Sequence, residues 1–172
     1  MVDNKQQDEL PDLIELTKYN GDWPPYLEAV YQYYLDEIAN ANLTYQGLRI
    51  SCKRIPLYEG KGAGFWHAIS EGETEETRTA DLRRCERIRW IPCIIKLAKD
   101  GINVTVTWWE NKRGANTHIV FLHEKESYVV ILAKRNDYYL LKTAYCATQR
   151  RLQKLIQERN QFWSSRKTKG AH

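Results

Sequence analysis

Two segments far apart in the chain contain the side chains best suited to acid–base and phosphate chemistry. His67 lies in "GFWHAISEG", residues 64–72, between glycines and close to an acidic run. An imidazole in such a place can titrate near neutral pH and act as a general base or a general acid. A single histidine is more often structural, here packed beside Trp66, so a catalytic interpretation of His67 requires partners from elsewhere in the chain.

The second segment is "YYLLKTAYC", residues 138–146. The hydroxyl of Thr143 could hydrogen-bond a phosphate, and Lys142 could offset the charge of that phosphate. Tyr145 has the parity of Thr143 if the strand continues, and its phenol can donate a proton or pack on a base. Threonine and tyrosine are also ordinary strand residues, so they indicate a site only if they meet His67 across the fold.

A third segment, "RRCERIRW" at residues 83–90, concentrates guanidinium groups. On a helix Arg84 and Arg87 would share a face, and on a strand Arg87 and Arg89 would. Either pair could clamp a phosphate or stabilise a pentacovalent transition state. The alternative is ion pairing with Glu86 or with the acidic N-terminal region.

The segment "TWWENKRGAN", residues 107–116, alternates aromatic and cationic side chains, which is typical of stacking on unpaired bases. We expect Trp109 to be the more exposed of its two tryptophans, His118 to be buried and His123 to enter a turn. The side chains expected to contact a nucleic acid are Lys53, Arg84, Trp109, Lys112, Arg113, Lys142 and Arg150.

The elements that must position these residues follow from hydrophobic periodicity. A helix is predicted after Asp22, over residues 22–42, with Pro24 and Pro25 in its first turn. A strand is predicted at 48–55, a long and partly mobile loop at 57–84, and a strand at 90–98. From Gly101 onward the pattern predicts four strands joined by short turns, at 102–109, 117–123, 128–134 and 138–143. A closing helix is predicted at 147–163.

Together these elements predict an α+β fold, in which a twisted antiparallel sheet of four to five strands, arranged as a meander, carries N-terminal and C-terminal helices. The expected organisation is a weakly ordered acidic segment or short helix at 1–20, one domain at 21–163 and a frayed basic tail at 164–172. A chain of 172 residues with 42% hydrophobic residues is long enough to bury one core.

Composition narrows the class of protein further. No apolar run is long enough for a membrane span, and the acidic, polar first ten residues do not resemble a signal peptide. The four cysteines have no zinc-binding spacing and are expected to be free thiols in a reducing cytoplasm. No dinucleotide, P-loop or metalloprotease motif occurs, so neither a cofactor nor a metal is expected.

Charge is unevenly distributed along the chain. Residues 1–40 hold nine acidic and two basic side chains, a net charge of −7, and residues 41–172 hold 24 basic and 13 acidic ones, a net charge of +11. A basic body favours a polyanionic partner such as RNA. The alternative is an ordinary solvated surface.

A basic α+β chain with "FWH", an antiparallel meander that ends in "LLKTAYC", and then a basic helix resembles the barnase–EndoU–colicin–RelE-like nuclease superfamily, particularly its phage-associated and mobile-element-associated members. The resemblance spans roughly residues 49–151. It implies metal-independent RNA cleavage with catalytic residues on the sheet. Residue by residue, His67 would be the catalytic histidine, Thr143 the hydroxyl on the last strand with Tyr145 beside it, and Arg87 the phosphate-stabilising cation, with Arg84 as the next choice.

The implied reaction is attack of a ribose 2′-hydroxyl on the neighbouring phosphorus, with His67 as base, Arg87 and Lys142 stabilising charge, and no residue assigned as general acid. A toxin or phage-associated ribonuclease of this kind would also have an antitoxin or immunity protein as a partner. Two other functions remain open. One is a nucleic-acid-binding module without catalysis, and the other is an interaction protein whose acidic first 40 residues engage a partner or shield the basic body.

Overall fold

The computed structural model describes residues 10–72, 74 and 76–169 of the chain. The α-helices of this part are α1 (Trp23–Tyr34), α2 (Ala63–Ile69), α3 (Leu82–Glu86), α4 (Trp90–Leu97) and α5 (Gln149–Lys169), with a short 3₁₀ helix η1 (Leu16–Tyr19) and a π-helical turn η2 (Leu35–Ala39). The strands are β1 (Thr44–Tyr45), β2 (Leu48–Ser51), β3 (Leu57–Tyr58), β4 (Lys61–Gly62), β5 (Ser70–Glu71), β6 (Thr79–Ala80), β7 (Val106–Arg113), β8 (Asn116–His123), β9 (Tyr128–Lys134) and β10 (Tyr138–Cys146).

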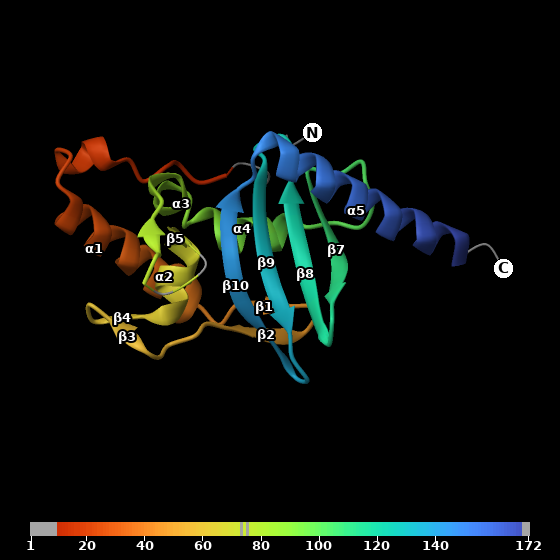
Figure 1. Cartoon of the computed structure of the whole chain (residues 1–172), viewed down its shortest axis with the longest axis horizontal. Coiled ribbons are helices and arrows are strands. Elements are labelled where there is room, and N and C mark those ends of the chain that lie inside the picture. The colour runs from red at the N-terminus through yellow and green to blue at the C-terminus, as the bar shows by residue number, and fades with distance from the viewer. Residues whose placement is uncertain (1–9, 73, 75, 170–172) are drawn as a thin grey trace, which may run out of the picture.

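The central sheet has the strand order β1-β2-β10-β9-β8-β7 within the described residues (Figure 1). Strands β7 to β10 form the predicted antiparallel meander. The α+β class is therefore confirmed, and so is the strand order predicted for the second half of the chain. The expectation of a purely antiparallel sheet of four to five strands is wrong in one respect, because β2 joins as a parallel neighbour of β10 and brings β1 with it, making six strands. Local hydrophobic patterns do not show such a pairing, since its two partners are far apart in sequence.

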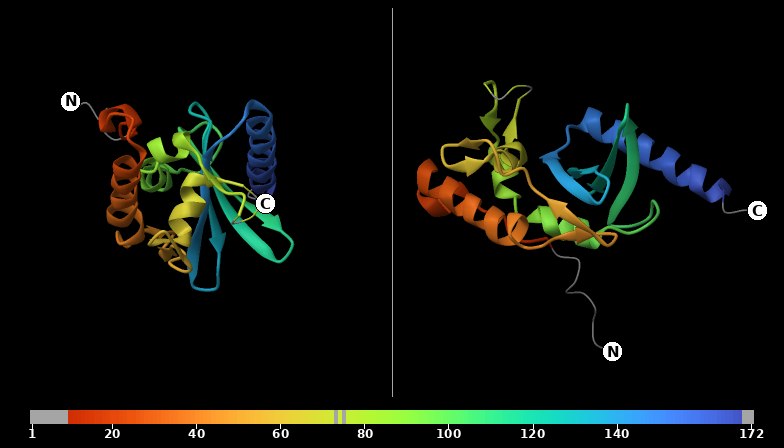
Figure 2. Two further views of the ribbon diagram at one scale, coloured as in Figure 1. Left: turned by 60° about the vertical axis from the view of Figure 1, so that its left-hand side comes forward. Right: turned by 90° about the horizontal axis from the view of Figure 1, so that it is seen from below.

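The two faces of this sheet carry different hydrophobic clusters, as the alternation along each strand requires. Side chains on the inner face belong to the main core, and those on the outer face form a second cluster beneath α5. The outer-face cluster consists of Trp109, Val120, Leu122, Val129, Leu152 and Leu155. Figure 2 shows α5 on one side of the sheet, with α1, α2 and α4 on the other side or at its edge.

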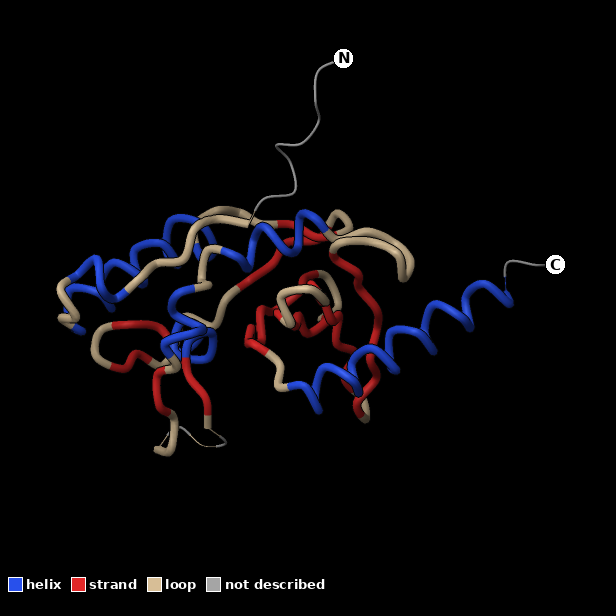
Figure 3. Tube along the Cα trace, turned by 90° about the horizontal axis from the view of Figure 1, so that it is seen from above, coloured by secondary structure: helices blue, strands red, loops and turns tan. Residues whose placement is uncertain are grey.

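The sheet is curled around its inner face, as the view from above shows (Figure 3). Tyr45 of β1 reaches across the curl to the far strands, with ring centroids 6.3 Å from Trp108 and 4.9 Å from Phe121. It also contacts Tyr139 of β10 at 5.6 Å. These aromatic contacts fill the inside of the curl and hold the short β1–β2 hairpin against the meander.

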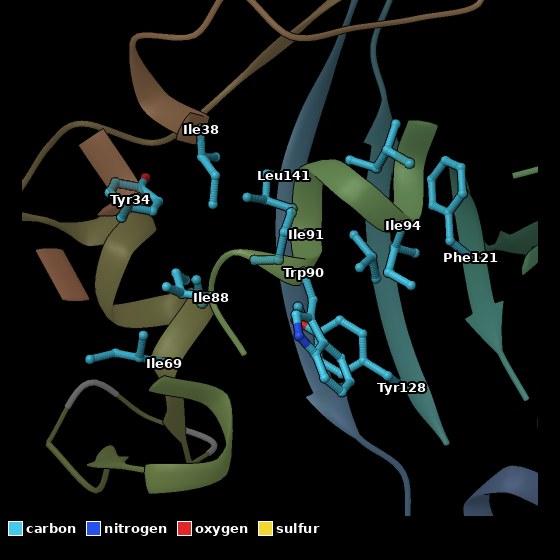
Figure 4. Packing of buried hydrophobic residues seen from close by; sticks show 14 of the residues in the cluster. Tyr34, Ile38, Ile69, Ile88, Trp90, Ile91, Ile94, Phe121, Tyr128 and Leu141 are labelled. Atoms are coloured by element: carbon cyan, nitrogen blue, oxygen red, sulfur yellow. The ribbon is translucent and has the colours of Figure 1, made fainter. Parts of the chain in front are cut away.

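The segment 90–98 is a helix, so the predicted strand there is wrong. Helix α4 starts at Trp90, which places Pro92 in the first turn, where a missing N–H disrupts no helical hydrogen bond. Its buried residues Trp90, Ile91 and Ile94 repeat at helical spacing and pack on the inner face of the sheet. Figure 4 shows them beside Phe121, Tyr128 and Leu141.

The segment 57–84 is also more ordered than predicted, since it contains two β-hairpins and the helices α2 and α3. Only part of the acidic run lies within the described residues. The prediction missed α2 because the stretch "GKGAG" and the acidic run on either side of it have low hydrophobicity. The side chains of Phe65, Ala68 and Ile69 in this short helix are buried in the main core.

The described N-terminal residues pack on the body and do not form a loose segment. Ile14 is 7% exposed, its backbone N–H donates to the carbonyl of Glu86 (3.0 Å), and its carbonyl accepts from the hydroxyl of Tyr26 (2.8 Å). The indole N–H of Trp90 donates to the carbonyl of Pro11 (2.7 Å). Residues 1–9 of the predicted acidic segment lie outside the described residues.

The remaining element boundaries differ only in length. Helix α1 begins after Asp22 as predicted, although the Asp22 side chain makes no capping hydrogen bond. The first strand of the meander begins at Val106 instead of residue 102, and α5 continues to Lys169, so the tail predicted from residue 164 is helical up to that point. No helix in the described ranges combines the length and the apolar character needed to cross a bilayer.

The position of α5 on the outer face can be tested by truncating Leu155, which is fully buried between the helix and the sheet. Leu155→Ala should lower the free energy of unfolding by about 2–5 kcal/mol, because the helix loses a buried side chain and leaves a cavity. Gln153→Ala, at an exposed site of the same helix, should change it by less than about 0.5 kcal/mol. Urea unfolding measures both, and equal stabilities for the two variants would contradict this packing.

Candidate functional site at the open edge of β10

Strand β10 has a strand neighbour on only one side along its second half. Strand β2 pairs with residues 138–140, whereas β9 pairs with residues 139–146. Helices α2 and α3 pack against the edge that β2 leaves open (Figure 1). Thr143 and Tyr145 lie opposite Ile131 and Val129, so they share the outer face of the sheet at this junction.

A β-bulge lies just before Thr143. The register between β9 and β10 shifts between Leu141 and Thr143, which makes Lys142 an extra residue without an opposite partner. Its side chain is exposed. A bulge bends its strand and redirects the side chains around it, so the bulge helps to set where Thr143 points.

Helix α2, which bears His67, is held close to the backbone before it. The Gly64 N–H donates to the carbonyl of Lys53 (2.6 Å), and a Cβ at Gly64 would lie 2.8 Å from that oxygen and 2.9 Å from the hydroxyl of Tyr34. Only glycine allows this approach. The Gly-rich stretch therefore serves to pack α2, whose half-buried His67 is brought next to β10.

Helix α3 is held in place from its first residue. Asp81 caps it by accepting from the backbone N–H groups of Arg83 (2.8 Å) and Arg84 (3.4 Å). The Asp81 N–H donates to the carbonyl of Ile69 at the end of α2 (2.7 Å). The two helices are thus joined directly, and the cap aims the side chain of Arg84 toward β10.

Arg84 is the centre of the junction. Its Nη1 donates to the carbonyl of Ser70 (2.7 Å) and to Oγ1 of Thr143 (3.4 Å), and its guanidinium lies 5.7 Å from the ring centroid of Tyr145. The Thr143 hydroxyl donates in turn to the backbone carbonyl of His67 (3.4 Å). The side chains of Arg84, Thr143 and Tyr145 are therefore brought together beside α2, whose His67 takes part through its backbone carbonyl.

Among the described residues, the charge of Arg84 is mostly buried and only loosely compensated. Its side chain is 12% exposed, the nearest carboxylate oxygen is Oδ2 of Asp81 at 4.0 Å, and its Nε is buried without a hydrogen-bond partner in the described part of the chain. Arg159 is also buried, but its Nη1 lies 2.6 Å from Oε2 of Glu124. Because burying a charge costs free energy unless it is well paired, Arg84 leaves a positive potential that an anion would satisfy.

A second guanidinium, from α5, reaches the hydroxyl of Tyr145. The Nε of Arg151, in the first turns of α5, donates to the Tyr145 hydroxyl (3.3 Å). Burial acts to lower the pKa of Arg151, but the bond to Tyr145 and the nearby carboxylate of Glu158 raise it above its ordinary value. Tyr145 therefore contacts two arginines.

The sequence suggested the neighbouring Arg150 as a nucleic-acid contact, and the side chain of Arg150 is exposed. The available signal for Arg151 was its place just after the end of β10.

Arg87 directly follows α3 and has other partners than Arg84. Its Nη1 contacts Oε2 of Glu86 (3.2 Å) and the carbonyl of Arg83 (3.1 Å), and its guanidinium stacks 5.1 Å from the ring of Trp90. Arg84, the second choice from the sequence for the phosphate-stabilising cation, is thus the residue that contacts Thr143. Arg87, the first choice, pairs with Glu86, which was the alternative expected for it.

The expected exposure of Trp109 is wrong. It is 1% exposed and lies beneath α5 in the outer-face cluster, so it offers no surface for base stacking. The period-two pattern assigned its face correctly but did not show that a helix covers it. The other expected contacts, Lys53, Lys112, Arg113 and Lys142, are exposed.

The structure also places two further histidines, both on β8, and the four cysteines. His118 is half-buried on β8, and His123 is 6% exposed at the end of that strand. None of the four cysteines forms a disulfide; Cys85 is buried and the others are half-buried. Burial raises the pKa of Cys146, which follows Tyr145, although the nearby arginines oppose that shift.

Searches of other proteins give no relative to compare with this site: no family model, no curated protein and no solved structure matches the chain. Within the described residues no group of three or more His, Cys, Asp or Glu side chains could hold a metal ion. The site is therefore argued from its own geometry.

The role of the Thr143 hydroxyl in holding this junction can be measured. Thr143→Val keeps the shape but removes the group that bridges Arg84 and the carbonyl of His67, so the free energy of unfolding should fall by about 1 kcal/mol. Thr143→Ser, which keeps the hydroxyl, should recover most of that loss in chemical denaturation. If Thr143→Val and Thr143→Ser were equally stable, the bridge would contribute nothing.

Proposed function

We propose that the protein is an endoribonuclease that cleaves RNA by attack of a ribose 2′-hydroxyl on the adjacent phosphorus, at the junction of α2, α3 and β10. The observation that carries the proposal is the buried, loosely compensated guanidinium of Arg84 against the hydroxyl of Thr143. A phosphoryl group that gains negative charge in its transition state fits such a site. Arginine is also the side chain whose fork of donors matches phosphate oxygens.

His67 and Tyr145 supply the two proton transfers in this proposal. The 2′-oxygen forms a bond to phosphorus as its proton passes to the imidazole of His67. The bond from phosphorus to the 5′-oxygen of the next nucleotide breaks as that oxygen takes the proton of the Tyr145 phenol. The bond from Arg151 occupies a lone pair of the Tyr145 oxygen and leaves its proton to be donated. The products are a 2′,3′-cyclic phosphate and a 5′-hydroxyl.

The charge distribution supports a polyanionic substrate. Residues 41–172, which contain all four proposed catalytic residues, have a net charge of +11. An electrostatic attraction of this kind also suits a module that binds RNA or DNA without cleaving it. The two functions share a surface and differ in whether His67 and Tyr145 transfer protons, so cleavage assays separate them. The same proposal includes a protein partner, an antitoxin or immunity protein that binds over the junction.

Arg84→Ala should lower kcat/KM for RNA cleavage by roughly 10²–10³-fold, because the group that meets the developing charge is lost. Arg83→Ala is the matched control, since Arg83 belongs to the same helix but its side chain is 63% exposed. The control should retain activity within a few-fold. Similar rates for Arg84→Ala and Arg83→Ala would contradict the role of Arg84, provided that circular dichroism shows both variants folded.

His67→Ala should lower the cleavage rate by about 10²–10⁴-fold, the usual contribution of a general base. The assay uses labelled RNA in the presence of EDTA, with an all-2′-deoxy oligonucleotide of the same sequence as a second substrate. The wild-type protein should cleave only the RNA and leave a cyclic phosphate end. Binding of RNA without any cleavage by the wild-type protein would support the non-catalytic module instead.

A further inference from the structure

The lower half of the outer face of the sheet carries no helix. Helix α5 covers the end of the sheet where β10 finishes and then runs past β7, and its buried residues pack against Trp109, Val120, Leu122 and Val129. In Figure 1 the lower parts of β8, β9 and β10 have no helix in front of them. This open surface lies between α2 on one side and α5 above, next to the junction that contains Arg84.

Strand register places a row of polar and basic side chains on this surface. Asn111 of β7 lies opposite His118 of β8, which lies opposite Ala133 of β9. The Asn111 side chain donates to Oε2 of Glu158 on α5 (3.0 Å), so this residue marks the border of the open surface. Arg113 and Asn116 form the pair two residues closer to the hairpin turn and point to the same face. The exposed, bulged Lys142 adds a basic side chain on β10, further from the turns.

Four basic side chains therefore gather on one uncovered surface: Arg113, His118, Arg135 and Lys142. Burial is the largest effect that lowers the pKa of His118, and the charges of Arg113, Lys142 and Arg135 lower it further. Beside them a pocket of about 590 Å³ opens between the two hairpin turns. It is lined by Ala115, Asn116, Thr117, Lys134, Arg135, Asn136, Asp137 and Tyr138. Asp137 is the one carboxylate in that lining, so the surface remains cationic.

We propose that this surface, from Arg113 across Arg135 to Lys142, binds the backbone of the single RNA strand that leads into the Arg84 junction. The inference rests on the proposed function and adds to it a substrate class, an extended single strand longer than a dinucleotide. Three strand spacings of about 4.8 Å separate β7 from β10, which gives a path on the order of 14 Å and room for more than one phosphate. Tyr138, at the rim of the pocket, offers a ring on which a base can stack.

An unpaired RNA suits this surface better than a protein partner does. The cations come from β7, from the β9–β10 turn and from β10, so an extended chain of phosphates that crosses these strands can meet them one after another. Large exposed apolar side chains gather elsewhere, at Ile55, Leu57 and Tyr58 around the β3–β4 hairpin. The open outer face thus has the charge of a nucleic-acid surface without the apolar centre of a protein interface.

The test measures binding separately from cleavage. The probe is a ten-nucleotide RNA in which every ribose carries a 2′-O-methyl group, so that it cannot be cut, and fluorescence anisotropy gives its Kd at several salt concentrations. The variant is Arg113→Gln, Arg135→Gln and Lys142→Gln combined. The control combines Lys18→Gln, Lys96→Gln and Lys125→Gln, which removes the same charge from exposed sites elsewhere.

We expect the variant to weaken binding at least 10-fold relative to the control and to reduce the slope of log K against log salt by about 2, or roughly 0.7 for each lost phosphate contact. Cleavage of a ten-nucleotide RNA should fall more than cleavage of a dinucleotide. Equal affinities and slopes for variant and control, or no binding of the probe by the wild-type protein, would overturn the inference. If the probe binds as expected but the wild-type protein cleaves no RNA, the proposed catalysis fails and the binding surface stands.

Discussion

The candidate site depends on one constraint, the positive charge of Arg84 held at a junction that water reaches poorly. A buried guanidinium is tolerated when donors and acceptors surround it, and here these are the Ser70 carbonyl, the Thr143 hydroxyl and a carboxylate of Asp81 at 4.0 Å. In the same molecule, the buried charge of Arg159 is compensated by a direct ion pair with Glu124. The difference between the two arginines is the physical basis for expecting an anion beside Arg84.

This junction exists because β2 is short. Its parallel pairing with β10 covers only residues 138–140, so the rest of that edge of β10 is left for α2 and α3. Those helices are in turn positioned by backbone contacts: the close approach of Gly64 to Lys53, and the bond from the Asp81 N–H to Ile69. A catalytic arrangement built on packed helices and a strand is held more rigidly than one built on loops.

The outer face of the sheet is divided between two roles. Near the end of β10, α5 covers an apolar cluster and brings Arg151 to Tyr145. Toward the hairpin turns the same face is open and cationic, with Lys142 raised by a bulge next to Thr143. The packing of α5 therefore sets both the second guanidinium of the junction and the boundary of the proposed RNA surface.

The sequence by itself determined the elements whose signals are local. The alternation along residues 106–146 gave the meander, the proline pair and apolar stripe gave α1, and residue chemistry selected His67, Thr143 and Tyr145 as candidates. Tertiary structure alone decided the parallel partner of β10, the burial of Trp109 under α5, the contact of Arg84 instead of Arg87 with Thr143, and the contact of Arg151 with Tyr145. Each of these depends on which elements pack together. Side-chain periodicity specifies the face that a residue points to, but not the element that covers that face, since that is set by burial and hydrogen bonding summed over the whole chain.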